Sequence, residues 1–255
     1  MLPQERHDQI IARLNIEGQV KVKELAYDFK VTEDCIRKDL AMLEKAGLLK
    51  RIHGGATQVR KNLHIFNVNE RISVRLPEKK QIANKAIDLI ESGTMIYLGI
   101  STVNLEIAKL IYQKNLNITV VTNMIDIMQI FTHGDCKAKL IFIGGSFNRA
   151  RDGFLGALVI EQIQKYRFDL AFLGAVGINI HDGKVTTYDV EDGITKKEVI
   201  NSSKKCYVVA ESAKLNLDGN YVYAHLSDFS GYICEKTLND SINNKIREYG
   251  IEIID

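Results

Sequence analysis

Seven short runs rich in apolar and β-branched residues recur along the chain from residue 95 onward. The runs are Met95–Leu98, Ile118–Val121, Leu140–Ile143, Leu170–Leu173, Tyr207–Ala210, Tyr232–Cys234 and Ile251–Ile254. Helical stretches separate most of them, at 103–112, 124–131, 155–165 and 194–204. Nearly continuous apolar strands that alternate with helices are typical of a largely parallel sheet covered on both faces. The pattern predicts a Rossmann-like α/β domain over residues 77–255, which opens with a helix because Pro77 favours a helix start.

The first 57 residues carry a different pattern, that of short amphipathic helices. Two are expected at 5–14 and 22–29, and Thr32 can cap a third. In this third helix Ile36, Leu40 and Leu43 share one face, which leaves an outer side that carries charges. A tight turn between the second and third helices makes a helix-turn-helix, whose last helix enters the major groove of DNA. We expect Thr32, Asp34, Cys35, Arg37 and Lys38 to meet base edges or phosphates there.

A β-hairpin is expected directly after the third helix. Alternating residues lead into Gly54-Gly55, which supplies a tight turn, and Thr57 follows. Lys50, Arg51 and His53 lie on this hairpin, so we expect them to contact the DNA backbone or the minor groove. The whole predicts a winged helix-turn-helix at 1–57, followed by a linker at 58–76.

Charge supports this interpretation weakly. The net charge of +2 comes from the first sixty residues, where 11 Lys and Arg face 9 Asp and Glu; 23 of each follow. A small amphipathic domain that only packs against a larger one, with solvated charges, is the plain alternative. The capped third helix, the adjacent basic residues on its outer face and the glycine-rich wing together favour a DNA-binding domain.

Composition excludes several other classes of protein. No run approaches the roughly 18 apolar residues that span a membrane, and the N-terminus has no signal-peptide apolar region. We therefore expect a soluble cytoplasmic protein with no membrane partner. The four cysteines lie far apart in sequence, so no metal site or disulfide is expected.

Residues 31–56, VTEDCIRKDLAMLEKAGLLKRIHGGA, closely resemble the N-terminal signature of the DeoR family of bacterial repressors. That signature is a V-S-x-x-T-I-R-R-D-L helix followed by L-E-x-x-G-x-L-x-R-x-H-G-G-A. Cys35 stands where the family has Thr, and a thiol donates hydrogen bonds weakly, so the operator can differ from that of relatives. The resemblance implies double-stranded operator DNA as a partner. Asp39 is expected to form an ion pair with an Arg or Lys side chain on a neighbouring helix.

Small residues follow three of the expected strands, at the edge where ligands bind in parallel sheets. They are Ser101 and Thr102, Thr122 and Asn123, and Gly144 and Gly145. Exposed backbone N–H groups in such loops suit a phosphate or another anion. Arg149, Arg151, Lys196 and Lys214 add candidate cations. Each loop alone is equally well explained as an ordinary turn.

Residues 71–234 resemble the DeoR-type effector domain, which is related in fold to ribose-5-phosphate isomerase and glucosamine-6-phosphate deaminase. Arg71, Glu78-Lys79-Lys80, V-V-T-N at 120–123 and I-G-G at 143–145 carry the match, among other pieces. The resemblance implies a phosphorylated sugar or related anionic effector and places Asp192, Lys196 and Lys214 at its site. Where many relatives have L-D-x-G-T-T, this chain has L-G-I-S-T-V from Leu98.

These patterns predict a transcriptional regulator, by analogy a repressor of a carbohydrate operon, with no cofactor and no catalytic residue. A homodimer or homotetramer is expected, because one small module reads a half-site weakly. A sugar-phosphate isomerase or deaminase with an added DNA-binding domain is the alternative, with Asp189, Glu191 or Asp192 as its base. A protein-interaction adaptor that has lost DNA binding is a third interpretation, against which Arg37 and Lys38 argue.

Overall fold

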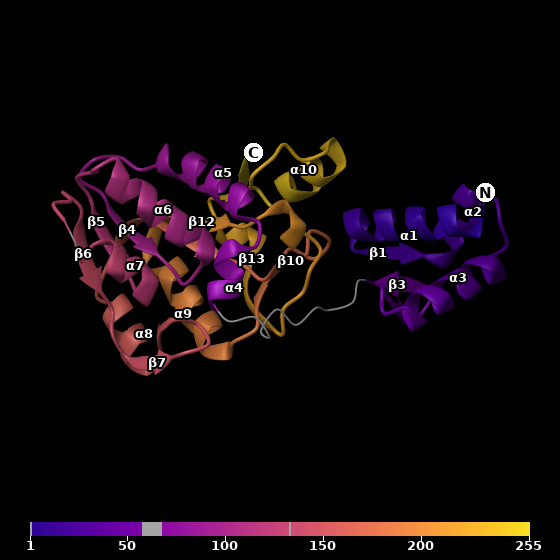
Figure 1. Ribbon diagram of the computed structural model, residues 1–255, viewed down its shortest axis with the longest axis horizontal. Coiled ribbons are helices and arrows are strands. Elements are labelled where there is room, and N and C mark those ends of the chain that lie inside the picture. The colour runs from indigo at the N-terminus through magenta and orange to yellow at the C-terminus, as the bar shows by residue number, and fades with distance from the viewer. Residues whose placement is uncertain (1, 58–67, 133) are drawn as a thin grey trace. The chain divides into compact units, whose positions relative to one another are not determined.

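The computed structural model describes residues 2–57, 68–132 and 134–255. The chain forms two compact units, one N-terminal and one C-terminal, and each has an apolar core of its own (Figure 1). The predicted linker at 58–76 lies in part outside the described residues. In its described part a helix, α4 (Val68–Ser73), stands where no regular element was predicted, and the next helix begins at Leu76.

In its described stretch, residues 2–57, the N-terminal unit has three helices and three short strands. They are α1 (Pro3–Glu17), β1 (Gln19–Lys21), α2 (Val22–Phe29), α3 (Glu33–Lys45), β2 (Lys50–Ile52) and β3 (Gly55–Thr57). The strands form an antiparallel sheet in the order β1-β3-β2. β1 was not predicted, since three residues are too few to show a period. The side chain of Val20 in β1 is buried and belongs to the apolar core of this unit.

The core of this unit follows the predicted helix faces. Ile10 and Leu14 of α1, Leu25 of α2, and Ile36 and Leu40 of α3 are almost completely buried. The left-handed conformation of Gly18, with φ of 74°, ends α1. The winged helix-turn-helix arrangement expected from the sequence is therefore present.

The C-terminal unit is built on a seven-stranded sheet in the order β15-β14-β12-β9-β4-β5-β6. Every neighbouring pair is parallel, which confirms the predicted α/β class. The strands correspond to the seven apolar runs: β4 (Met95–Leu98), β5 (Thr119–Thr122), β6 (Lys139–Phe142), β9 (Phe168–Gly174), β12 (Ser203–Val209), β14 (Gly231–Ile233) and β15 (Glu252–Ile254).

Helices cover both faces of this sheet, with α5 and α6 on one side and α8 and α9 on the other (Figure 1). The helices are α5 (Leu76–Ile87), α6 (Thr102–Gln113), α7 (Ile125–Ile130), α8 (Ala157–Ile163), α9 (Val190–Asn201) and α10 (Asp240–Arg247). Apolar side chains of α5 and α6, such as Ile82 and Ile107, pack against strand residues such as Leu98 and Phe172. No helix in the described ranges is long and apolar enough to cross a membrane.

Two small antiparallel additions complete the unit, and neither was predicted. One is the sheet β10 (Gly177–Ile178), β11 (Lys184–Thr187) and β13 (Tyr221–His225); the other is the hairpin β7 (Ser146–Asn148) and β8 (Gly153–Leu155). Turns η2 (Ser212–Lys214) and η3 (Leu226–Asp228) are 3-10 helices. These strands are two to five residues long, and the pairing partners of β11 and β13 are about 40 residues apart in sequence. Local periodicity does not reveal such pairs.

Candidate nucleic-acid interface and anion site

The outer face of α3 carries the predicted DNA-facing charges, but they are already paired with one another. The guanidinium of Arg37 donates to Glu33 Oε2 at 2.5 Å and to Asp34 Oδ1 at 2.6 Å, and all three side chains are exposed. Asp34 therefore holds Arg37 in place and offsets its charge in the free protein. Lys38 is exposed beside them, and the described residues give it no ion pair.

The beginning of α3 is fixed by the predicted cap. Thr32 Oγ1 accepts a hydrogen bond from the backbone N–H of Cys35 at 3.2 Å. Thr32 is exposed, whereas Cys35 is partly buried. The cap satisfies one of the free N–H groups of the first turn and leaves the hydroxyl proton of Thr32 able to donate outward.

The wing is attached to α3 through Glu44. Its two carboxylate oxygens accept from the backbone N–H of Arg51 at 2.8 Å and from Arg51 Nε at 2.7 Å. These bonds from Arg51 hold the pKa of Glu44 below its ordinary value. Arg51 is thereby tied to the recognition helix, while Lys50 and His53 are exposed on the wing.

Asp39 lies on the inner side of α3 and is buried, as the sequence suggested. Arg6 Nε and His7 Nε2 of α1 lie 2.5 and 2.9 Å from its two carboxylate oxygens. Burial alone would raise the pKa of Asp39, but the bonds from Arg6 and His7 outweigh it and hold the pKa below its ordinary value. This buried cluster joins α1 to the recognition helix.

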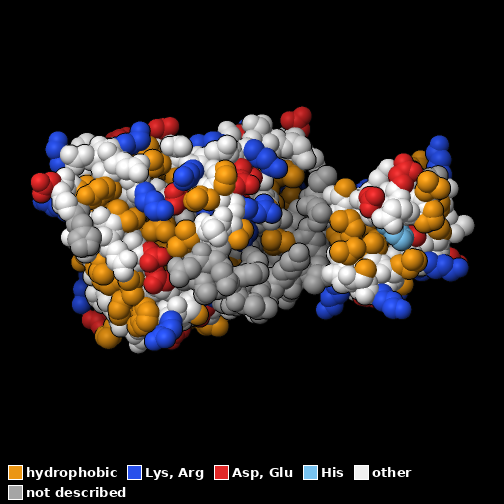
Figure 2. Space-filling view, viewed as in Figure 1, with side chains coloured by type: hydrophobic (Ala, Val, Ile, Leu, Met, Phe, Trp, Pro, Cys, Tyr) orange, Lys and Arg blue, Asp and Glu red, His pale blue; other side chains and the backbone are white. Residues whose placement is uncertain are grey.

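On the visible face of the N-terminal unit the positive charges are spread out. Figure 2 shows its Lys and Arg side chains at separate places on the visible face, with acids and apolar side chains between them. On this face the cations do not form one continuous basic patch. A few placed cations on α3 and the wing remain the candidates.

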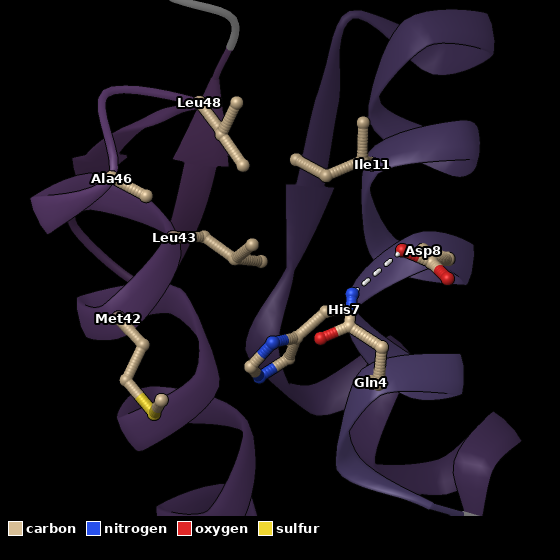
Figure 3. Close-up of a pocket in the computed structure, with 8 residues that line it drawn as sticks. All are labelled: Gln4, His7, Asp8, Ile11, Met42, Leu43, Ala46 and Leu48. Atoms are coloured by element: carbon tan, nitrogen blue, oxygen red, sulfur yellow. Dashed lines mark hydrogen bonds between the residues drawn. The ribbon is translucent and has the colours of Figure 1, made fainter.

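An apolar groove lies between α1 and α3, away from the start of the recognition helix (Figure 3). It is lined by Gln4, His7, Asp8, Ile11, Met42, Leu43, Ala46 and Leu48. Along α1, on one side of the groove, Gln4 donates to Asp8 at 3.1 Å, and Met42 and Leu48 are exposed. None of the predicted effector residues lines this groove, which belongs to the N-terminal unit.

In the C-terminal unit, two of the predicted strand-end residues serve the scaffold. The hydroxyl of Thr122 donates to the carbonyl of Leu98 at 2.7 Å and accepts from the N–H of Met124. Asn123 accepts from the Tyr97 hydroxyl and donates to the carbonyl of Phe154, both at 2.8 Å. Their polar side-chain atoms are thus engaged within the protein.

Ser101 and Thr102 form the start of α6, at the end of β4. Ser101 Oγ accepts from the N–H of Val103 at 3.2 Å, which leaves its proton to donate. The end of β9 comes very close: a Cβ on Gly174 would lie 2.6 Å from Ser101 Oγ. Glycine at 174 therefore gives this capping side chain its space.

The third predicted loop has a packing role in the structure. A Cβ on Gly145 would lie 2.7 Å from Val159 of α8, and the carbonyl of Gly144 accepts from Gln162. Arg149 is exposed, whereas Arg151 is buried. Arg151 is the member of this stretch that lies near the other candidate cations.

Arg71 of α4 lies close enough to Arg151, Lys79 and Lys214 for their positive charges to act on one another. Burial lowers the pKa of Arg71, and the charge of Arg151 lowers it further. Lys79 Nζ donates to the backbone carbonyl of Arg71 at 2.5 Å. Burial also lowers the pKa values of Lys79 and Lys214, and Arg71 adds to both effects. Glu211 raises the pKa at both lysines and so opposes these effects.

Asp192 and Lys196 form a buried ion pair beside this group. Lys196 Nζ lies 2.7 Å from Asp192 Oδ2, and the Thr187 hydroxyl donates to the same oxygen at 2.7 Å. Lys196 also lies over the ring of Tyr223, at 5.3 Å. The charge of Asp192 raises the pKa of Arg71, so the pair is electrically coupled to the cations.

The candidate bases of the enzyme alternative have structural partners or lie in solvent. Asp189 caps α9 by accepting from the N–H of Asp192 at 3.0 Å, and Glu191 is exposed. Asp192 is held by Lys196 and Thr187. These placements match the capping and pairing roles that charged helix starts commonly have.

The structure thus brings together four predicted effector residues, Arg151, Asp192, Lys196 and Lys214, around two that were not predicted for the site. These two are Arg71 and Lys79. We call the set of Arg71, Lys79, Arg151 and Lys214 the cation group. The carboxylates whose charges act on this group are Glu106, Asp152, Asp192 and Glu211, and Asp192 is paired with Lys196. The signal for Arg71 and Lys79 was present in the family match, but they lie before the first strand rather than at a strand end.

Two family models cover most of the chain. The DeoR C terminal sensor domain matches residues 75–236, and the DeoR-like helix-turn-helix domain matches residues 6–62. An uncharacterized HTH-type transcriptional regulator, FruR of Bacillus subtilis, is 32% identical over 89% of each chain. The HTH-type transcriptional repressor GlcR of Bacillus subtilis is 26% identical over 100% of this chain and 96% of its own.

The lactose phosphotransferase system repressor of Staphylococcus epidermidis is 27% identical over 98% of each chain. Among solved structures, ribose 5-phosphate isomerase A of Methanocaldococcus jannaschii has a TM-score of 0.39 at 16% identity, over 54% of this chain and 53% of its own. Likenesses at that level carry no argument about function. The sensor-domain and helix-turn-helix matches together show that the chain belongs to the DeoR family of transcriptional regulators.

Proposed function

We propose that this DeoR-family regulator represses a carbohydrate operon by binding operator DNA, and that a phosphorylated sugar or related anion releases it. The observation that carries the proposal is the pairing of two features in one chain. The N-terminal unit presents α3 and its wing, and the C-terminal unit gathers four buried or partly buried cations, Arg71, Lys79, Arg151 and Lys214. The lactose phosphotransferase system repressor among the relatives supports the choice of operon.

On the DNA side, Arg37 and Lys38 are the proposed major-groove contacts, with Thr32 and Cys35 at the helix start. Asp34 acts on Arg37: on binding, the guanidinium exchanges Glu33 and Asp34 for phosphate or base-edge acceptors. Lys50, Arg51 and His53 contact backbone or minor groove. Because single modules bind half-sites weakly, the protein acts as a homodimer or homotetramer on a symmetric operator.

On the effector side, the cation group binds the anionic part of the ligand, with Ser101 and Thr102 as further donors. The Asp192–Lys196 pair offers a carboxylate and an ammonium to sugar hydroxyls. Thr122, Asn123, Gly144 and Gly145 shape the loops rather than touch the ligand. The chain acts as a regulator and not as an isomerase or deaminase, since its candidate bases cap a helix, pair with a lysine or lie in solvent.

The DNA assignment is tested with operator sequences selected from random DNA by the purified full chain. The double variant Arg37→Ala/Lys38→Ala should bind the selected DNA at least ten-fold more weakly. Its log–log salt slope should also fall by about 0.9 for each phosphate that the variant no longer neutralises. The matched control is Lys165→Ala/Arg167→Ala, which removes one exposed lysine and one exposed arginine from the C-terminal unit and should change neither quantity. Unchanged affinity in the first variant rejects this assignment.

A further inference from the structure

Arg71 sits in an unusual electrostatic position for an arginine with a purely structural role. Its Nη2 donates to the carbonyl of Ala150 at 3.3 Å, a long bond, and its Nε is buried with no hydrogen-bond partner among the described residues. The described residues place no carboxylate within ion-pair distance of it. A buried charged donor left without an acceptor costs more stability than an ordinary hydrogen bond contributes.

The residues around Arg71 increase this cost. The positive charge of Arg151 lowers its pKa, and Arg71 in turn lowers the pKa values of Lys79 and Lys214. Asp192 and Asp152 act in the opposite direction, but burial and Arg151 prevail. Like charges collected around an unsatisfied guanidinium nitrogen are relieved most directly by a bound anion, because a guanidinium binds phosphate and carboxylate oxygens through paired N–H groups.

The position of Arg71 in the chain gives this arrangement a consequence. It belongs to α4, the six-residue helix with which the described C-terminal unit begins, and the chain runs from there toward the N-terminal unit. Lys79 of α5 holds the same segment by donating to the Arg71 carbonyl. Any ligand of the Arg71 guanidinium therefore also holds the segment that leads to the DNA-binding unit.

We propose that Arg71 is a direct ligand of a phosphate-class anion in the sensor unit, and that occupancy of this site fixes α4. The inference rests on the proposed function in taking the cation group as the effector site. It adds the residue and the segment through which an effector acts on the DNA-binding unit. An anion that binds more tightly when α4 is docked shifts the protein toward that state by the ratio of its two affinities.

The test uses the full chain and inorganic phosphate as the probe. Phosphate affinity is measured by titration calorimetry, and the amide exchange of residues 68–73 is measured by mass spectrometry with and without phosphate. In the wild-type chain phosphate should slow exchange in α4. Arg71→Gln should weaken phosphate binding at least ten-fold and abolish this protection, and Arg71→Lys should give intermediate values because it keeps the charge but loses the paired donors.

The matched control is Lys80→Gln, which removes an exposed cation from α5 next to Lys79 and should behave as wild type. If Arg71 only fastens α4 to the loop at Ala150, Arg71→Gln speeds exchange without phosphate but leaves phosphate affinity unchanged, and the proposal is overturned. Arg71→Lys answers the same question if the Gln variant does not fold. No phosphate binding by the wild-type chain also overturns it.

The proposed function fails in a different way. A chain that selects no DNA sequence, yet shows phosphate-dependent protection of α4 that requires Arg71, refutes the operator proposal and leaves Arg71 as an anion ligand. The opposite outcome is sequence-specific DNA binding together with an Arg71→Gln variant that still binds phosphate normally. That outcome supports the operator proposal and refutes Arg71 as an anion ligand.

Discussion

At the scale of single residues, the molecule separates charges that hold it together from charges that are left for partners. Asp39 is buried with two basic partners from another helix, whereas Arg37, two positions before it, is exposed and paired within its own helix turn. Exposed pairs of the second kind contribute little stability, so breaking them costs the protein little. Buried pairs of the first kind cannot be broken cheaply.

Asp39→Asn should destabilise the N-terminal unit by about 3 kcal/mol, because it leaves the Arg6 charge buried without its carboxylate. Amide exchange in α1 and α3 of the full chain measures the loss. Asp34→Asn, an exposed change on the same helix, should stay within about 0.5 kcal/mol of wild type. Equal exchange in the two variants would show that the buried cluster does not stabilise the unit.

The same residue predicts an acid dependence. Because the pKa of Asp39 is lowered in the folded unit, the unfolded chain takes up the proton first as pH falls. The contribution of Asp39 is therefore complete above the ordinary aspartate pKa of about 3.9 and is lost as pH falls through the lowered folded value. Asp39→Asn should remove this part of the acid dependence, as measured by amide exchange of the N-terminal unit over a pH series.

At the scale of elements, the wing depends on one close approach of two backbones. Gly55 of β3 pairs with Lys21 of β1, and a Cβ on Gly55 would lie well inside van der Waals contact with the Val20 carbonyl oxygen. A backbone atom is not free to move aside as a flexible side chain would. The pairing of β3 with β1 therefore requires glycine at position 55. The preceding turn separately favours glycine at position 54, where φ is 77°.

Gly55→Ala should destabilise the wing sheet by about 1–3 kcal/mol, the usual cost of overpacking. Faster amide exchange in β1 and β3 and weaker binding to selected operator DNA would report it, while phosphate binding stays normal. The control is Gly144→Ala, since a Cβ there meets nothing within 4 Å. Unaltered exchange in the Gly55 variant would contradict the close approach.

At the scale of the whole molecule, two separate apolar cores predict two unfolding transitions. In calorimetry of the full chain, Asp39→Asn should lower the midpoint temperature of one of these transitions. Phosphate at about 100 times its dissociation constant should stabilise only the other, by about 2.7 kcal/mol. A single transition that both changes shift together would show that the two units unfold as one.

The sequence alone determined the elements whose signal is local. Seven apolar runs predicted all seven strands of the parallel sheet, and the spacing of Ile36, Leu40 and Leu43 predicted the inner face of α3, because strand and helix periods are written in neighbouring residues. The family was also identified from such local motifs.

The tertiary structure decided what depends on distant residues. Only folding brings Arg71 and Lys79, which precede the first strand of the sheet, to Lys214 beyond β12, and so forms the cation group. It also turns Thr122 and Asn123 into scaffold residues by giving them partners on other strands and loops. Burial and charge are properties of assembled neighbours. For this reason a rule that considers only the residues after each strand did not point to Arg71 or Lys79.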